Sequence, residues 1–140
     1  MEKFPTQMRV VAGALRAESG LWLMHKRPDD KHHGGLWEFP GGKVQRGETL
    51  EKALFRELQE ELAIEIDLTS LDHVGCARRG ADAAQPPIVI DLYTVDRWSG
   101  LPDPQEGGCV NWFSLNQIRG LAKPPLDEEL LKQLMQKHAR

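Results

Sequence analysis

A leucine repeat in the middle of the chain is the feature that most constrains the fold. In the segment TLEKALFRELQEEL, leucine recurs at every fourth position, at Leu50, Leu54, Leu58 and Leu62. Residues four apart lie on one face of an α-helix, so the repeat predicts a helix with one apolar stripe. That stripe is buried only if the helix docks on another element, which requires a layered fold with a core.

Apolar and β-branched runs on both sides of this helix predict strands. The expected strands are residues 8–15, 21–27, 36–40, 64–68, 71–79, 88–98 and 109–115. A second helix is expected at 124–140, where acidic residues come first and basic residues last, as the helix dipole favours. Glycine- and proline-rich segments, among them 41–48 and 99–108, are expected to be turns and loops. This order predicts an α/β sandwich, a single domain over residues 1–140 with a central mixed sheet between helices.

Composition and local sequence restrict the partners and the compartment. The net charge of -3 gives no broad basic surface, so a nucleic acid polymer is not an expected partner. Cys76 and Cys109 are too few for a disulfide framework, so we expect two buried or half-buried thiols in a reducing compartment. The first residues lack the pattern of a secretory signal, and no apolar run is long enough to span a membrane. We therefore expect a cytoplasmic protein with no membrane partner.

Glutamates crowd one face of the predicted helix, at Glu57, Glu60 and Glu61. Like charges three or four residues apart on a helix repel each other by a few tenths of a kcal/mol per pair. The simplest interpretation is a solvated acidic face. A metal site explains more, because the leucine stripe holds the helix in place and the glycines of PGGKVQRGE allow exposed backbone carbonyls. Such an oxygen-rich site suits Mg²⁺, which also bridges substrate phosphates.

The spacing of these residues resembles the Nudix box, the signature of hydrolases that cleave a nucleoside diphosphate linked to another group. After Gly42 come Glu48, then Arg56-Glu57-Leu58, then Glu60-Glu61. The one departure is Ala63, where the family usually has glycine, and it concerns the end of the helix rather than the chemistry. The resemblance implies a Nudix α/β/α sandwich. It also implies Mg²⁺ as the cofactor, with Mn²⁺ as an alternative.

The resemblance implies a role for each matching residue. The implied metal ligands are the backbone carbonyl of Gly41 and the carboxylates of Glu57, Glu60, Glu61 and Glu106. Glu48 and Arg56 are implied to form an ion pair that orients Glu57. The metal would activate a water for attack on phosphorus, while a carboxylate removes the proton. Glu57 and Glu106 are both candidates for that general base.

Segments outside the box, LWEFPGGK, VDRWSG and NWFSL with PPLDEEL, resemble the MutT-type branch. Its members hydrolyse oxidised or non-standard nucleoside triphosphates to the monophosphate and pyrophosphate. The implied substrate-binding residues are Arg27, His32, Phe39 and Asp127. Asp127 stands where the 8-oxoguanine specialists have asparagine, and an ionised aspartate only accepts hydrogen bonds. It would suit the N–H groups of a guanine-like edge or the amino group of cytosine. The connector GADAAQPP lacks the aromatic and the arginine that relatives place near the base.

These features together predict a Mg²⁺-dependent nucleoside triphosphate pyrophosphohydrolase. The leading substrate is 8-oxo-dGTP, whose removal sanitises the nucleotide pool and avoids mutation. CTP or 5-substituted pyrimidine triphosphates are the alternative, and another Nudix reaction, on dinucleoside polyphosphates or a nucleotide sugar, is a second hypothesis. A non-catalytic Nudix module that binds nucleotide or protein is a third, which has no need of crowded carboxylates. The protein is expected to be a monomer or a homodimer.

Overall fold

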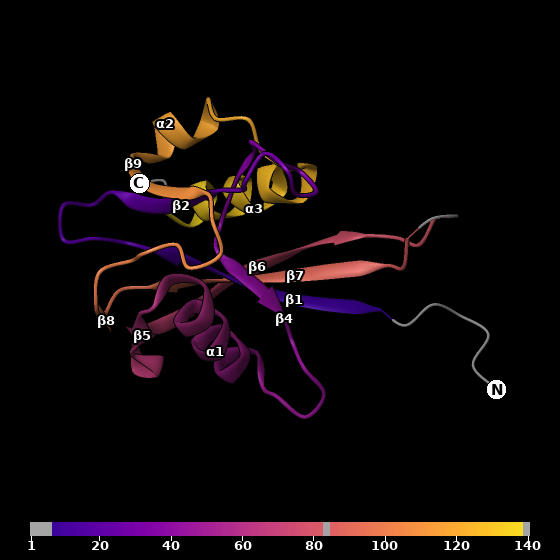
Figure 1. The fold of residues 1–140 in the computed structure, drawn as a ribbon, viewed down its shortest axis with the longest axis horizontal. Coiled ribbons are helices and arrows are strands. Elements are labelled where there is room, and N and C mark those ends of the chain that lie inside the picture. Colours follow the sequence, from indigo (N-terminus) through magenta and orange to yellow (C-terminus); the bar gives the residue numbers. More distant parts are fainter. Residues whose placement is uncertain (1–6, 83–84, 139–140) are drawn as a thin grey trace.

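A four-stranded mixed sheet lies at the centre of the computed structural model, which describes residues 7–82 and 85–138 (Figure 1). Its strands follow the order β4-β1-β7-β6. The bounds are Met8–Leu15 for β1, Gly41–Lys43 for β4, Leu71–Arg79 for β6 and Ile88–Val95 for β7. β1 runs parallel to β7 and antiparallel to β4, and β6 runs antiparallel to β7. The predicted mixed sheet is therefore confirmed.

Helices cover both faces of this sheet. Helix α1 (Leu50–Leu62) lies on one face, and α2 (Leu115–Arg119) and α3 (Pro125–His138) lie on the other (Figure 1). Alternate residues of β1 point to opposite faces, as the pleat requires. One face packs Val11 and Leu15 against the buried leucines of α1, and the other packs Ala12 and Ala14 against those of α3. The predicted α/β/α sandwich is confirmed, and the leucine stripe is the part of α1 that faces the core.

Two smaller sheets complete the fold. β2 (Trp22–Lys26) pairs antiparallel with both β3 (Trp37–Glu38) and β9 (Cys109–Phe113). β5 (Glu65–Ile66) pairs with β8 (Trp98–Ser99), and a short 3₁₀ helix at Leu68–Ser70 leads into β6. Strands β2 and β3 flank the loop of residues 27–36, which contributes Arg27, His32 and His33 to the candidate site. No helix in residues 7–82 and 85–138 is long and apolar enough to cross a membrane.

Some local predictions are wrong. The glycine segment 41–48 is not all turn, because residues 41–43 form β4 against β1. That close pairing needs glycine, since a Cβ on Gly41 would collide with the carbonyl oxygen of Val11. The strand predicted at 88–98 breaks after Val95, and Trp98 belongs to β8. Helix α2 was not predicted, because five residues are too few to show a helical period. Its sequence signal is a capping box between Ser114 and Gln117.

The end of α1 shows how the chain accommodates Ala63 in place of glycine. Ala63 adopts φ 58° and ψ 36°, the left-handed conformation, and its N–H donates to the carbonyl oxygen of Gln59 at 3.0 Å. An L-residue with a Cβ pays roughly 1 kcal/mol for this conformation. Ala63 therefore keeps the helix end that glycine would give, at a small cost in backbone strain.

The two thiols differ in exposure. Both Cys76 and Cys109 are free, as predicted. Cys76 is partly buried in β6, but Cys109 is exposed, which corrects the expectation that both are buried or half-buried. Cys109 is the first residue of β9, directly after the loop of residues 100–108.

Replacing Leu58 with alanine tests the role of the leucine stripe. Leu58 is fully buried, so Leu58→Ala is expected to lower the free energy of unfolding by about 3 kcal/mol. The matched control is Leu101→Ala, because Leu101 is 87% exposed and its removal should cost less than about 0.5 kcal/mol. Urea unfolding followed by circular dichroism measures both values. Similar losses for the two variants would contradict the docking role of the stripe.

Candidate functional site

Arg56 connects the acidic face of α1 to the segment that precedes the helix. Its guanidinium pairs with both carboxylate oxygens of Glu48, with Nε to Oε2 at 2.7 Å and Nη2 to Oε1 at 2.9 Å. Nη2 also donates to the carbonyl oxygen of Lys43 at 2.9 Å, at the end of β4. The hydrogen bond from Arg56, aided by the amide of Gln45, lowers the pKa of Glu48 to about 2. The predicted ion pair is therefore present, and it fixes the 43–48 segment against the helix.

The same guanidinium holds two of the clustered glutamates. Nη1 of Arg56 donates to Glu57 at 2.9 Å and to Glu60 at 3.2 Å. The Glu57 carboxylate also lies against Gly42 so closely that any Cβ at that position would collide with it. Glycine in β4 thus leaves room for the carboxylate, and the arginine orients it. Glu60 is less restrained, because its side chain is 54% exposed.

Glu61 lies in a different environment from its neighbours. Its side chain is only 14% exposed, and Oε1 has no hydrogen-bond partner among the described residues. Burial raises the pKa of Glu61 to about 8. His25 opposes this rise, while the charges of Glu38, Glu57 and Glu106 add to it. The ionised form of Glu61 is therefore disfavoured when no cation is present.

His25 lies beside Glu61 on strand β2. Its Nδ1 is 3.8 Å from Oε1 of Glu61 and 3.9 Å from Oε2 of Glu38. Burial by itself lowers the pKa of His25, but the nearby carboxylates of Glu38 and Glu61 and the hydrogen bond to the Gly107 carbonyl outweigh it, so the pKa is raised. His25 was not among the residues singled out from the sequence. A lone histidine in an apolar strand gives no signal of this contact until β2 and α1 are brought together.

Glu106 reaches the same region from the loop between β8 and β9. The side chain is exposed, and its charge is one of those that raise the pKa of Glu61. The loop is tied to the end of α1, since the N–H of Gln105 donates to the carbonyl oxygen of Glu61 at 2.8 Å and that of Asp103 to Leu62 at 2.9 Å. The fold therefore places Glu106 near the acidic face, as expected from the sequence.

The side chains of the acidic face offer the oxygen ligands that a hard divalent cation prefers. Carboxylates from α1 and from the 99–108 loop are oxygen donors, and the unpartnered Oε1 of Glu61 is the atom that a cation would relieve. Across residues 7–82 and 85–138, however, no three His, Cys, Asp or Glu side chains already converge closely enough to hold a metal. The carboxylates of Glu57 and Glu60 both accept a hydrogen bond from Nη1 of Arg56.

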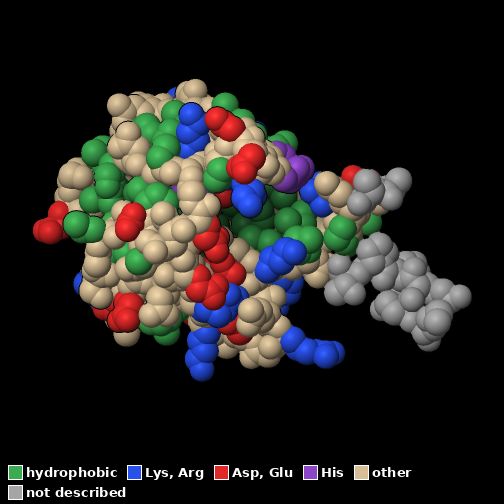
Figure 2. Space-filling model, viewed as in Figure 1, with side chains coloured by type: hydrophobic (Ala, Val, Ile, Leu, Met, Phe, Trp, Pro, Cys, Tyr) green, Lys and Arg blue, Asp and Glu red, His purple; other side chains and the backbone are tan. Residues whose placement is uncertain are grey.

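A pocket of about 640 Å³ opens beside the acidic face. Figure 2 shows it as a hollow with a hydrophobic floor, with acidic side chains at one edge and Lys and Arg side chains around it. Gly41 and Gly42 of β4 line it at the end nearest α1. All four residues expected to bind substrate also line it, namely Arg27, His32, Phe39 and Asp127. The structure therefore brings the two sets of candidate residues to adjoining places.

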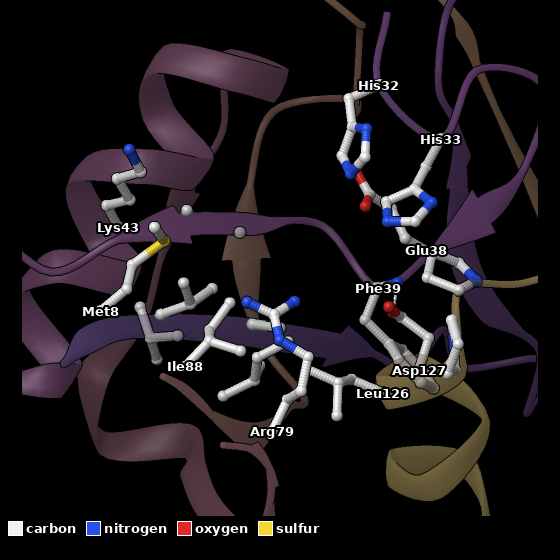
Figure 3. Close-up of a pocket in the computed structure, with 18 of the residues that line it drawn as sticks. Met8, His32, His33, Glu38, Phe39, Lys43, Arg79, Ile88, Leu126 and Asp127 are labelled. Carbon is white, nitrogen blue, oxygen red and sulfur yellow. Dashed lines mark hydrogen bonds between the residues drawn. The ribbon is translucent and has the colours of Figure 1, made fainter. Parts of the chain in front are cut away.

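Phe39 and Asp127 are in direct contact in this pocket. The backbone N–H of Phe39 donates to Oδ2 of Asp127 at 3.0 Å, although the two residues are 88 positions apart (Figure 3). Asp127 is 6% exposed, and burial raises its pKa to about 7, against the effect of the Phe39 hydrogen bond. Burial therefore disfavours the ionised form of Asp127, which is the hydrogen-bond acceptor considered from the sequence.

Arg27 and the two histidines form another wall. Nη1 of Arg27 pairs with both oxygens of Glu38, at 3.1 and 3.3 Å. The rings of His32 and His33 are 4.0 Å apart on the exposed loop above the pocket (Figure 3). Burial and the neighbouring His32 lower the pKa of His33. The two imidazole rings and one arginine thus border the opening.

Arginines at the end of β6 were missed from the sequence. Arg78 and Arg79 line the pocket, and Nη2 of Arg79 donates to the carbonyl oxygen of Pro86 at 2.9 Å. The Arg79 guanidinium points into the pocket, between Ile88 and Asp127 (Figure 3). The connector 80–87 itself contains no arginine, as its sequence shows. The strand before that connector provides one.

Lys123 is a second residue that the sequence did not reveal. Its side chain is fully buried, and Nζ donates to the carbonyl oxygens of Ile118 at 2.6 Å and Leu121 at 2.7 Å. These bonds close the turn between α2 and α3, and the pocket residues Pro124 to Asp127 follow directly after Lys123. Lys123 therefore fixes the wall that bears Asp127.

Comparisons with known proteins agree with this geometry. The model of the NUDIX domain family matches residues 6–136. An 8-oxo-dGTP diphosphatase of Escherichia coli K12 is 32% identical over 128 residues, which cover 91% of this chain and 96% of that protein. A CTP pyrophosphohydrolase of the same strain is 32% identical over 129 residues, 92% and 93% of the two chains. The solution structure of the E. coli ORF135 protein superimposes with a TM-score of 0.84 at 30% identity, covering 96% of this chain and 93% of that one.

Glu61→Gln is expected to stabilise the metal-free protein, and to do so more at pH 8 than at pH 5. The pKa of Glu61 is raised from 4.5 to about 8, so the unfolded chain loses its proton first and stability falls as the pH rises between these values. Removing the charge should therefore add roughly 1–3 kcal/mol by pH 8. Urea unfolding in EDTA at both pH values measures the gain.

Glu60→Gln is the matched control for this pH series. Glu60 is more than half exposed, so its replacement should change the free energy of unfolding by less than about 0.5 kcal/mol at either pH. A Glu61→Gln gain of the same size at pH 5 and pH 8 would show that burial of the charge is not its cause.

Proposed function

This chain belongs to the Nudix family, and on that premise we propose that it is a nucleoside triphosphate pyrophosphohydrolase of the MutT type. Members of the family to which it is similar hydrolyse phosphorus-containing anhydrides, and this protein is such a hydrolase. The observation that carries the proposal is the place of β4. Its residues Gly41 and Gly42 lie between the carboxylates of α1 and the pocket. A phosphate chain attached to a base in the pocket would pass over these glycines to the acidic face.

The proposed metal ligands are Glu57, Glu60, Glu61, Glu106 and the carbonyl oxygen of Gly41. Mg²⁺ bound there, or Mn²⁺ in its place, would neutralise phosphate charge and acidify the attacking water. Arg56 and Glu48 then act through position, because their ion pair orients Glu57 and keeps β4 beside the helix. Glu57 and Glu106 are the candidates for the general base.

The base is proposed to bind between Phe39, Arg79 and Asp127. Asp127 presents a carboxyl on one side, and the guanidinium of Arg79 presents donors on the other (Figure 3). An ionised Asp127 accepts the N–H groups of a guanine-like edge, which favours 8-oxo-dGTP and a part in nucleotide-pool sanitation. A 5-substituted pyrimidine triphosphate or CTP is the second candidate, supported by equal 32% identity to an 8-oxo-dGTP diphosphatase and a CTP pyrophosphohydrolase.

The domain extent, the partner, the location and the oligomeric state are proposed alongside this reaction. The chain is proposed to act as one domain over residues 1–140, with a nucleoside triphosphate as its partner. A cytoplasmic location and a monomeric or homodimeric state remain predictions. Hydrolysis of dinucleoside polyphosphates is the other Nudix reaction to be tested, because the pocket and the acidic face by themselves suit any nucleoside diphosphate linked to a second group.

A substrate panel with Mg²⁺ tests the proposed reaction. The panel holds 8-oxo-dGTP, dGTP, CTP, diadenosine polyphosphates and ADP-ribose, with phosphate and pyrophosphate assayed separately. We expect pyrophosphate from the triphosphates, and Glu57→Gln should lower kcat by about 100-fold or more. Glu65→Gln is the control, since Glu65 is an exposed residue of β5 outside the site. Release of phosphate instead of pyrophosphate would refute the reaction. No turnover of any compound would favour a binding module.

Asp127→Asn tests how the base is chosen. The ratio of kcat/KM for 8-oxo-dGTP in the wild-type protein to that in Asp127→Asn cancels ionisations at the metal site, which act on both proteins. Because the pKa of Asp127 is raised to about 7, the ionised acceptor grows as the pH rises through 7, and this ratio should rise several-fold from pH 6 to pH 8. An asparagine does not titrate, so the variant keeps only the pH dependence that the metal site contributes to both proteins. The same slope in both proteins would exclude Asp127 from base selection.

A further inference from the structure

The loop that carries Glu106 is fixed at two points, with a short span between them. The N–H of Gln105 donates to Glu61 at 2.8 Å, and Cys109 begins β9 opposite Lys26. Between these points lie Glu106, Gly107 and Gly108, and both glycines have positive φ, 93° and 77°. Glycine gives the backbone its widest conformational freedom. The span therefore needs another contact if it is to keep Glu106 in one place.

His25 provides a contact of this kind. It is 7% exposed, and its Nε2 lies 3.2 Å from the carbonyl oxygen of Gly107. A carbonyl oxygen only accepts, so Nε2 is the donor. No other side chain in residues 7–82 and 85–138 forms a hydrogen bond to the span from Glu106 to Gly108. The span also packs against Lys26 and Pro28, but the imidazole of His25 supplies the side-chain hydrogen bond at its middle.

The opposite nitrogen of the ring faces the acidic site. Nδ1 lies 3.8 Å from Oε1 of Glu61, a proposed metal ligand, and 3.9 Å from Oε2 of Glu38. The ring therefore stands between the loop on one side and the carboxylates on the other. A packing role alone would be served by any apolar side chain of this size, and it would not require a donor aimed at the Gly107 carbonyl.

We propose that His25 is a positioning residue, which holds the span Glu106–Gly108 over Glu61 and so keeps the Glu106 carboxylate at the acidic face. The inference rests on the proposed function for the role of Glu106. It concerns a residue outside the set implied by the Nudix box. The proposal depends on one hydrogen bond, from Nε2 of His25 to the carbonyl oxygen of Gly107. Loss of that bond should increase the backbone motion of Gly107 and Gly108.

Two variants of matched size separate the hydrogen bond from packing. Glutamine and methionine are similar in length and uncharged, but only glutamine keeps an N–H that can reach the Gly107 carbonyl. In ¹⁵N relaxation of the metal-free protein, His25→Met should lower the order parameters of Gly107 and Gly108 from about 0.85 to below about 0.6. Gln105 and Cys109 should stay ordered. His25→Gln should keep the wild-type values.

Metal binding and turnover then show whether the loop acts through Glu106. Mn²⁺ affinity is measured by electron paramagnetic resonance without substrate, and kcat is measured with Mg²⁺. His25→Met and Glu106→Gln should each lower both quantities by about 10-fold or more. The double variant should be no worse than Glu106→Gln alone, because the tether has nothing left to position. His25→Gln should stay within a few-fold of wild type.

Several results would overturn the proposal. If Gly107 and Gly108 keep wild-type order parameters in His25→Met, His25 does not hold the loop. Equal losses of Mn²⁺ affinity and kcat in the Met and Gln variants would show that the hydrogen bond is not the cause. Losses that multiply in the double variant would show that His25 does not act through Glu106. Failure of the proposed function looks different: the wild-type protein would turn over no nucleoside triphosphate. The loop order and the Mn²⁺ affinity would still report on His25, because neither measurement uses substrate.

Discussion

The guanidinium of Arg56 is the interaction on which the rest of the site depends. It bonds to Glu48 at two points, to the carbonyl oxygen of Lys43, and to two of the clustered glutamates. It therefore joins the start of α1, the end of β4 and the acidic face in one network. Such charge-assisted bonds are stronger and more directional than neutral ones, and the planar fork fixes several oxygens at once. Through the Lys43 carbonyl, this network holds the end of β4, with Gly42, beside Glu57.

Without a cation, the clustered carboxylates of the acidic face lower the stability of the folded protein. Burial and three neighbouring carboxylates raise the pKa of Glu61 to about 8, and its Oε1 has no partner among the described residues. The leucine stripe opposes this cost, since Leu54, Leu58 and Leu62 are completely buried against the sheet. The core therefore holds the helix in place while its other face remains unfavourable until charge is neutralised. Conflicts of this kind between local stability and fold are typical of functional sites.

The sequence is informative where residues act through fixed spacing. The helix α1 and its apolar stripe follow from positions a few residues apart, the Glu48–Arg56 pair was implied by resemblance to a motif of fixed spacing, and all are present in the structure. The pocket is different. Arg79 enters it from the end of β6, and Asp127 meets Phe39 across 88 positions of sequence. Local patterns contain no information on which strand ends will face each other, so the strand at 71–79 was predicted but the place of its last arginines was not.

The sequence alone determined the fold class and the type of chemistry, because helical periodicity and the spacing of a short motif are local properties. It also named four pocket residues, although only through resemblance to a known family. The tertiary structure alone decided the electrostatic states of the site. It buried Asp127 and Glu61, which raises their pKa values, and it brought His25 between Glu61 and Gly107. Desolvation and contact between distant segments depend on what surrounds a residue in space, and that is fixed only when the layers pack.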